Sequence, residues 1–138
     1  NMCSKKLQLL MIRNFCNPNF PKKFMKVIPI LRIFDYVKTI EFYVNWLGFT
    51  IDWEHKYGEN FPVYMQVSFR HITLHLSEHH GDCVPGARVY IEFSNLKAYH
   101  KELINKDYKF NKPGLGTDMC MDVTDPFGNR LSFNEAKS

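Results

Sequence analysis

Two neighbouring stretches of the chain carry groups that could do chemistry, and both alternate polar with apolar residues. From 62 to 69 and from 72 to 78, apolar side chains recur at every second position. Because successive side chains of a β-strand point to opposite faces, the apolar set faces a core and the polar set shares the other face. That polar set is Tyr64, Gln66, Ser68, His71, Thr73, His75 and Ser77.

The histidines of this region have the strongest claim to metal chemistry. His71 and His75 are four residues apart on one strand, so they lie roughly 13 Å apart at ~3.3 Å per residue, too far to share an ion. His79 and His80 follow in a loop. One interpretation is a metal site of His75, His79 and Asp82. The other, which the spacing favours, is a polar wall beside a surface loop.

The rest of the sequence predicts the elements that must position these residues. Strands are expected over 26–34, 49–55, 62–69, 72–78, 87–93, 108–110, 118–123 and 130–134, with helices over 36–47 and 96–105. Pro29 places the first strand at a sheet edge or seam. The order β-α-β-β-β occurs twice with similar lengths, which indicates an α+β fold of two tandem units, about 26–80 and 87–135.

The first helix has clear boundaries and an unusually wide apolar surface. Asp35 is a good N-cap, and Gly48 supplies the left-handed stop. Four apolar residues recur at helical spacing and three aromatic residues widen the surface: Val37, Ile40, Val44, Leu47, Phe42, Tyr43 and Trp46. Such a helix is expected to pack against more than its own sheet. Ser94 or Asn95 is expected to cap the second helix.

The strongest turn signal lies near the C-terminus. An apolar run stops at Asp125-Pro126, turns through Gly128-Asn129, and resumes as alternating Leu131 and Phe133. Proline presets φ, aspartate can accept hydrogen bonds from the backbone ahead of it, and glycine and asparagine tolerate positive φ. This stretch predicts a closing β-hairpin, in which Asp125 caps the turn rather than acting as an acid or base.

This hairpin and several other pieces resemble the glyoxalase/bleomycin-resistance/extradiol-dioxygenase superfamily, also called the vicinal oxygen chelate superfamily, and within it the bleomycin-resistance-like proteins. The pieces are VIPILR at 27–32, EFY at 41–43, LGF at 47–49, DWEH at 52–55, LHLSEHHGD at 74–82 and DPFGNR at 125–130. The resemblance covers about residues 26–135. It implies eight strands in two curved half-barrel sheets, each around a cleft, and a homodimer whose clefts lie at or near the subunit interface.

Metal-using members of the superfamily bind a divalent ion through residues on the inner strands. The matching positions here are Ile28, His75, Val89 and Ser132, of which His75 alone is an ordinary ligand. Three or four donors are needed to hold zinc, iron or manganese. We therefore expect no metal, no cofactor and no catalytic residues, and a non-catalytic protein that sequesters a planar, partly polar ligand or a bleomycin-like antibiotic. The alternative is a metal-dependent lyase, isomerase or dioxygenase of the same superfamily.

The resemblance implies a ligand-binding cleft whose walls are polar and aromatic. Aromatic faces with a few hydrogen-bonding groups suit a planar, partly polar ligand. The expected ligand-binding residues are Trp53, Tyr64, Gln66, Ser68, Thr73, His75, Arg130 and Ser132. Trp46 is interpreted as core or interface packing, and Glu92 as either a cleft or a surface carboxylate.

Composition excludes several other classes. The 138 residues are 45% hydrophobic, with a net charge of +4 and no basic stripe interleaved with aromatics, which argues for a globular domain that does not bind nucleic acid. The four cysteines form no Cys-x-x-Cys pair, so reduced thiols in the cytoplasm are the simplest expectation. The apolar run 9–12 is too short for a membrane span.

Residues 1–25 are expected to be an N-terminal extension. Leu7, Leu10, Met11 and Phe15 could line a short helix that packs on a partner, and Pro18 and Pro21 would end it. The other interpretation is a segment added by an upstream start codon or by cloning. A protein-interaction module that uses residues 2–24 as an arm is a third functional class.

Overall fold

The computed structural model describes residues 25–138. The first unit contains β1 (Ile30–Arg32), α2 (Tyr36–Thr39), η1 (Ile40–Trp46), β2 (Thr50–His55), β3 (Tyr64–Phe69) and β4 (Ile72–Ser77). Its strands form a four-stranded sheet, here sheet A, in the order β1-β4-β3-β2. The helix expected within residues 1–24 lies outside the described part of the chain.

The second unit contains β5 (Arg88–Phe93), α3 (Leu96–Asn105), β6 (Cys120–Thr124) and β7 (Arg130–Glu135). Its strands form sheet B, in the order β5-β7-β6. In each unit the first strand runs parallel to the last, β1 to β4 and β5 to β7, while the other neighbours are antiparallel. This shared pairing confirms two tandem units in an α+β fold.

Three expectations about the elements were wrong in detail. Residues 108–110 form a turn, so residues 25–138 contain seven strands and the eight implied above are not present. β1 is shorter than 26–34, and it lies at the edge of sheet A, as Pro29 indicated. Asn95 occupies the N-cap position of α3 with φ of 63° and makes no side-chain cap. Glu135 accepts hydrogen bonds from the backbone N–H groups of Asn95 and Leu96 instead.

The first helix begins as expected and then widens. Asp35 caps it by accepting from the backbone of Lys38, and Gly48 follows it with φ of +87°. Residues 40–46 form a π-helix, in which hydrogen bonds span five residues, as from Leu47 N to the carbonyl oxygen of Phe42. The expected apolar stripe is wrong at Val37, which is 65% exposed. The residues buried from this segment are Thr39, Phe42, Tyr43, Trp46 and Leu47.

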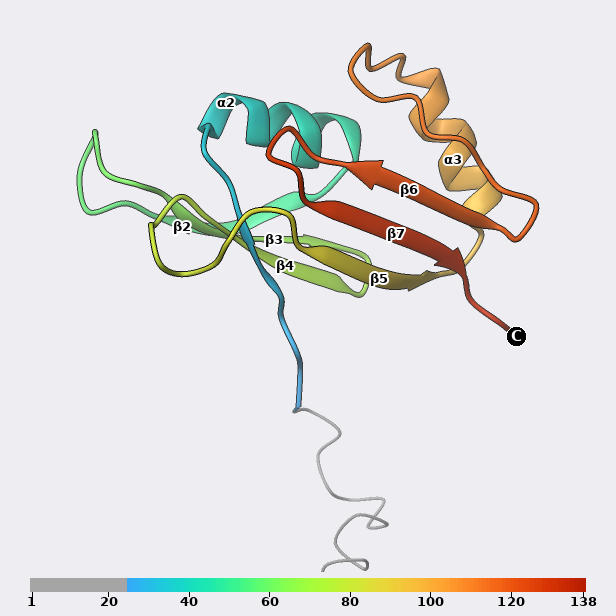
Figure 1. Cartoon of the computed structure of the whole chain (residues 1–138), viewed down its shortest axis with the longest axis horizontal. Helices are drawn as coiled ribbons and strands as arrows, with labels where there is room; N and C mark the ends of the chain where they lie inside the picture. Colours follow the sequence, from blue (N-terminus) through green and yellow to red (C-terminus); the bar gives the residue numbers. More distant parts are fainter. Residues whose placement is uncertain (1–24) are drawn as a thin grey trace, which may run out of the picture.

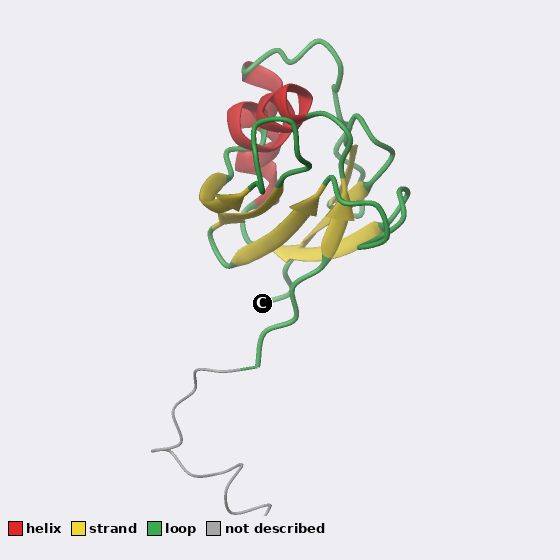
Figure 2. Cartoon of the chain, turned by 90° about the vertical axis from the view of Figure 1, so that its left-hand side faces the viewer, coloured by secondary structure: helices red, strands yellow, loops and turns green. Residues whose placement is uncertain are grey.

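The helices cover one side of both sheets. α2 and α3 lie above the strands in Figure 1 and remain above them in the perpendicular view of Figure 2. The apolar faces of both sheets and the helices share one core cluster. Phe69 of sheet A stacks on Phe93 of sheet B and on Tyr99 of α3, with ring centroids 6.1 and 5.3 Å away. The two units therefore form one packed body.

Hydrogen bonds between the units close this body. Trp46 donates its indole N–H to the carbonyl of Leu103, and the hydroxyl of Tyr99 donates to the carbonyl of Leu47. Trp46 is 2% exposed, which confirms core packing for that residue. The helix that begins at Tyr36 thus packs against the second unit as well as its own sheet. None of the helices in residues 25–138 is long and apolar enough to cross a membrane.

The closing hairpin forms where the turn signal placed it, between β6 and β7. One carboxylate oxygen of Asp125 accepts from the backbone N–H groups of Phe127 and Asn129. The other accepts from the hydroxyl of Tyr43 at 2.7 Å and from the side-chain amide of Asn129 at 2.8 Å. Burial raises the pKa of Tyr43 well above its ordinary value, so the phenol remains a donor. Asp125 is a turn cap that also joins the two units, here called the Asp125 seam.

Candidate functional site

The open face of sheet A carries a continuous chain of hydrogen-bonded polar groups. The hydroxyl of Tyr64 lies 2.8 Å from Nδ1 of His75, and Nε2 of His75 lies 3.0 Å from the amide oxygen of Gln66. The amide nitrogen of Gln66 donates to Asp52 at 2.9 Å, and the hydroxyl of Ser68 donates to the same carboxylate at 2.8 Å. These five residues are the polar cluster.

The polar cluster exists because the pairing of β3 with β4 places the right residues opposite each other. Gln66 pairs with His75, and Ser68 pairs with Thr73, so alternation along each strand puts all four on one face. The alternate residues Met65, Val67, Leu74 and Leu76 are at most 1% exposed and anchor the other face in the core. The strand pattern of the sequence is sufficient to place these four polar side chains together.

A β-bulge brings Trp53 and Asp52 to the same face. Ile51 pairs with Val67, and the next pair is Trp53 with Gln66, so Asp52 is the extra residue. Strict alternation would have sent Asp52 and Trp53 to opposite faces. With the bulge, Trp53 stacks on Tyr64 at 5.9 Å with 9° between the rings, and it remains 42% exposed. Asp52 was not among the expected residues, because no glycine or proline in β2 marks the bulge.

The hydrogen bonds determine which nitrogen of His75 carries the proton. Gln66 donates its amide N–H to Asp52, so its oxygen is free to accept from Nε2–H of His75. Nδ1 of His75 is then the acceptor for the hydroxyl of Tyr64. Burial, and then the charge of Lys26, lower the pKa of His75 and favour this neutral form. Both ring nitrogens are therefore engaged within the polar cluster.

Two further residues complete the electrostatics of this face. Lys26 donates to the hydroxyl of Thr73, so it extends over the sheet from the segment before β1. The hydrogen bonds from Gln66 and Ser68 lower the pKa of Asp52, and Lys26 adds to the effect. The carboxylate is consequently ionised at neutral pH, close to one lysine. Lys26 was missed by sequence reasoning, since it precedes the first ordered element and belongs to no motif.

Arg130 and Ser132 lie on the other sheet. Both are in β7, and Ser132 is 1% exposed and accepts a hydrogen bond from Nε of Arg88 at 2.8 Å. In residues 25–138 no hydrogen bond joins Arg130 or Ser132 to the polar cluster. The structure thus brings six of the eight expected residues together on sheet A and leaves two on sheet B. Glu92 is an exposed residue of β5.

The residues present do not fit a divalent metal. His75 uses both nitrogens within the polar cluster, and Ile28 and Val89, at two of the positions that ligate metal in other members, are hydrocarbon side chains. The described residues contain no group of three or more His, Cys, Asp or Glu side chains that could hold a metal ion. Ser77 and Asp82 hydrogen-bond each other at 2.6 Å, so Asp82 is also engaged.

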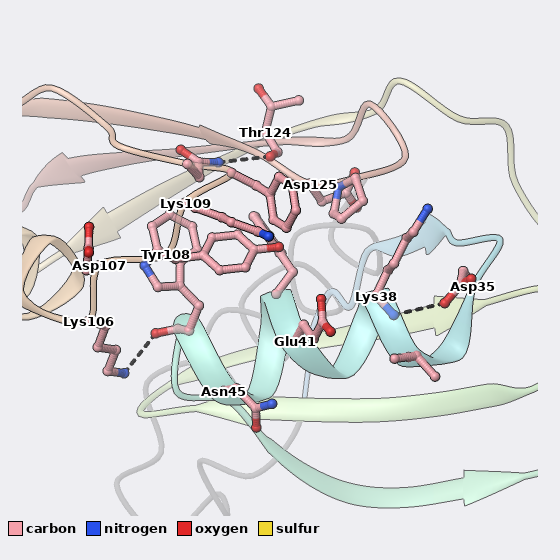
Figure 3. Close-up of a pocket in the computed structure, with 16 residues that line it drawn as sticks. Asp35, Lys38, Glu41, Asn45, Lys106, Asp107, Tyr108, Lys109, Thr124 and Asp125 are labelled. Atoms are coloured by element: carbon pink, nitrogen blue, oxygen red, sulfur yellow. Dashed lines mark hydrogen bonds between the residues drawn. The ribbon is translucent and has the colours of Figure 1, made fainter.

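A large cavity lies elsewhere, on the helix side of the molecule. It measures about 1110 Å³ and lies between the helical segment 35–46 and the segment 106–111, beside Thr124 and Asp125 (Figure 3). Two of its charged groups are engaged: Asp35 accepts from the backbone of Lys38, and Lys106 donates to the carbonyl of Trp46. We prefer the polar cluster of sheet A as the candidate site, because there a half-exposed tryptophan stacks beside polar groups that hydrogen bonds hold in place.

The fold is shared with several solved structures. Two tandem units whose sheets are covered by helices on one side match the fold of solved bleomycin-binding proteins. One, solved in complex with bleomycin, is 17% identical with a TM-score of 0.61 and covers 83% of this chain and 100% of its own. The bleomycin resistance determinant encoded on transposon Tn5 is also 17% identical, with a TM-score of 0.62. The match covers 83% of this chain and 100% of that one.

A third solved structure is more similar in sequence. The bleomycin-binding protein of the bleomycin producer Streptomyces verticillus, complexed with copper(II)-bleomycin, is 26% identical, with a TM-score of 0.60 and 83% and 98% of the two chains covered. No curated protein matched the chain. A family model described as "Glyoxalase superfamily protein" matches residues 18–138. The chain therefore belongs to the glyoxalase superfamily, which confirms the family to which the sequence motifs pointed.

Proposed function

We propose that this protein binds a small, planar, partly polar organic ligand on the open face of sheet A and releases it unchanged. The observation that carries the proposal is the stacking of the half-exposed Trp53 on Tyr64, directly above a chain of hydrogen bonds that fixes Gln66 and His75. A ligand ring can extend this stack, and the fixed polar groups can orient it without a large loss of side-chain freedom.

Sequestration rather than catalysis follows from how these groups are used. A general base needs an unshared nitrogen or oxygen directed at the substrate, yet both nitrogens of His75 are hydrogen-bonded within the sheet. Solved relatives that bind bleomycin share the fold, and the most similar of those compared above holds the copper complex. A bleomycin-like antibiotic is therefore the first ligand to test.

We further propose that the site is completed in a homodimer. The face that carries the polar cluster also exposes large apolar side chains: Ile30, which pairs with His75, is 38% exposed, and Tyr57 next to β2 is 74% exposed. Exposed apolar groups beside a polar surface suit an interface. Sedimentation equilibrium should give twice the mass of the 138-residue chain, and a monomer at micromolar concentration would contradict this part of the proposal.

The test is a tryptophan-fluorescence titration with copper(II)-bleomycin. The chain has two tryptophans, Trp53 at the site and Trp46 in the core. Saturable quenching at one ligand per subunit is expected, and it should be lost in Trp53→Phe and retained in Trp46→Phe. A flat titration with folded wild-type protein would exclude bleomycin as the ligand. Equal quenching in both variants would place binding elsewhere.

A further inference from the structure

Arg32 is a buried cation at the edge of sheet A. It is the last residue of β1 and pairs with Ser77 at the end of β4. Its neighbours Leu31 and Ile33 are at most 1% exposed in the core, so alternation directs Arg32 to the same face as Ser77. Arg32 itself is only 9% exposed. A charged side chain buried to this extent normally has a partner of opposite charge.

That partner is missing from residues 25–138. Nη1 of Arg32 is buried and donates to no acceptor there, and none of the ion pairs in this part of the chain includes Arg32. The guanidinium lies over the ring of Phe34 at 4.8 Å, which favours the cation but satisfies none of its N–H groups. The carboxylate of Asp82 accepts instead from the hydroxyl of Ser77 at 2.6 Å.

A cavity of about 370 Å³ lies beside this arginine. Phe34 forms one side, and His80, Gly81, Cys83 and Val84 of the loop after β4 line the rest. Burial raises the pKa of the Cys83 thiol, so this side chain stays neutral and does not supply the missing negative charge. The cavity has a volume typical of small-ligand sites. Its walls are mostly apolar, and Arg32, whose Nη1 has no partner in residues 25–138, is one of the residues that line it.

We propose that this cavity, the Arg32 pocket, binds the oxyanion group of a small organic molecule, a carboxylate or a phosphate. A guanidinium presents parallel N–H groups that match two oxygens of such a group, and the low polarity around Arg32 strengthens the pairing. Phe34 and Val84 suit the hydrocarbon part of the molecule. The pocket lies at the β1 edge of sheet A, where Arg32 and Tyr64 pair with Ser77 from opposite sides. The proposal uses none of the contacts of the Trp53–Tyr64 stack and does not rest on the ligand proposed for it.

The experiment uses three anions at constant ionic strength: inorganic phosphate, benzoate and phenyl phosphate, with sodium chloride as reference. Binding is followed by the amide NMR signal of Gly81 and by the thermal unfolding midpoint of the full chain. A saturable shift of Gly81 and a higher midpoint are expected with at least one anion. A response to phosphate alone indicates a free inorganic oxyanion, and a response only to the aromatic anions indicates an organic ligand.

Three variants test the role of Arg32. Arg32→Met should abolish both responses and, without anion, unfold at the same temperature as wild type or higher, because it removes an uncompensated buried charge. Arg32→Lys keeps the charge without the two-pronged geometry and should weaken binding at least tenfold. Arg70→Met is the matched control, because Arg70 is exposed and donates to the carbonyl of Ser94, outside the Arg32 pocket. This variant should respond to the anions like wild type.

Two results would overturn the proposal. The first is a wild-type protein whose Gly81 signal and unfolding midpoint respond to none of the anions beyond chloride. The second is a folded Arg32→Met or Arg32→Lys variant that binds as tightly as wild type. If Arg32→Met does not fold, the wild-type titration and Arg32→Lys still decide the question.

Discussion

Asp125 and Arg32 are two buried charged residues that differ in how far their hydrogen-bonding groups are satisfied. Asp125 is 5% exposed, and its two oxygens accept four hydrogen bonds, from Tyr43, Phe127 and Asn129. Arg32 is 9% exposed, and its Nη1 has no partner in residues 25–138. Asn129 connects the two sites, since its side-chain amide donates both to Asp125 and to the carbonyl of Arg32.

The difference teaches how to separate structural from binding roles among buried charges. A charge whose hydrogen bonds are all made inside the chain stabilises the native state and has no capacity left for a ligand. A buried charge with an unmet donor beside a cavity is costly to the free protein, and a bound anion removes that cost. The Asp125 seam holds the two units together, whereas the Arg32 pocket is available for binding.

The largest expected effect is the loss of Asp125. Asp125→Ala removes the acceptor of four hydrogen bonds and should lower the free energy of unfolding by about 3 kcal/mol or more. Urea denaturation monitored by circular dichroism measures it. Asp122→Ala is the control, because Asp122 is a half-exposed partner in a 3.5 Å surface ion pair with Arg88. It should cost less than about 1 kcal/mol. Equal losses of stability in the two variants would mean that the Asp125 seam stabilises the fold no more than a surface ion pair does.

Removing one donor from the seam should have an intermediate effect. Tyr43→Phe keeps the ring packing and deletes the 2.7 Å hydrogen bond to the carboxylate, so it should cost about 1.5–3 kcal/mol. Tyr36→Phe is the matched control, because the hydroxyl of Tyr36 donates to Glu54 at an exposed position. The control should change stability by about 0.5 kcal/mol or less. A neutral Tyr43→Phe would contradict the role assigned to this bond.

The polar cluster should contribute less to stability than the Asp125 seam, and its contribution should depend on pH. The pKa of His75 is lower in the folded protein than in the unfolded chain, so the unfolded chain takes up the proton more readily. Stability linked to His75 is therefore complete above the unfolded-state value of about 6.5 and falls as the pH drops through it. Comparing urea midpoints of wild type and His75→Gln between pH 5 and 8 isolates this effect. Parallel profiles would show that His75 does not titrate in this way.

The smallest expected effect belongs to Asp52, which is exposed. Its pKa is lowered in the folded state, so its contribution is present above the unfolded value of about 3.9 and is lost as the pH falls through the folded value. Asp52→Asn should therefore lower the stability slightly at pH 7 and leave it equal to that of wild type at a pH below the folded-state value. A variant that is less stable at pH 7 by as much as Tyr43→Phe would show that the bulge itself depends on the carboxylate.

Local patterns in the sequence predicted most of the fold. The alternation in β3 and β4 fixed the face of Gln66 and His75, because a one-residue error would bury these polar side chains. The turn at Asp125 formed as expected because aspartate, glycine and asparagine each satisfy a backbone requirement that neighbouring residues set. The region 108–110 did not become a strand, since three residues with no partner strand gain no ladder of hydrogen bonds.

The bulge at Asp52 and the π-helix from Ile40 were not predictable in the same way. In both places the backbone departs from its usual period, so Trp53 and the buried aromatic residues of the helix face directions that simple periodicity does not give. These departures bury large rings or stack them, and the gain in packing exceeds the loss of regular hydrogen bonding. Neither departure is marked by a glycine or a proline within its element.

The sequence by itself determined the family, the two tandem units and the polar face of sheet A, because each depends on residues close together along the chain. The tertiary structure alone decided that Asp52 and Lys26 join that face and that Arg130 and Ser132 lie on the other sheet. It also decided that Nη1 of Arg32 is buried without an acceptor in residues 25–138. The burial of a side chain and the satisfaction of its hydrogen bonds depend on which distant segments meet in the fold. Local sequence patterns therefore do not predict either property.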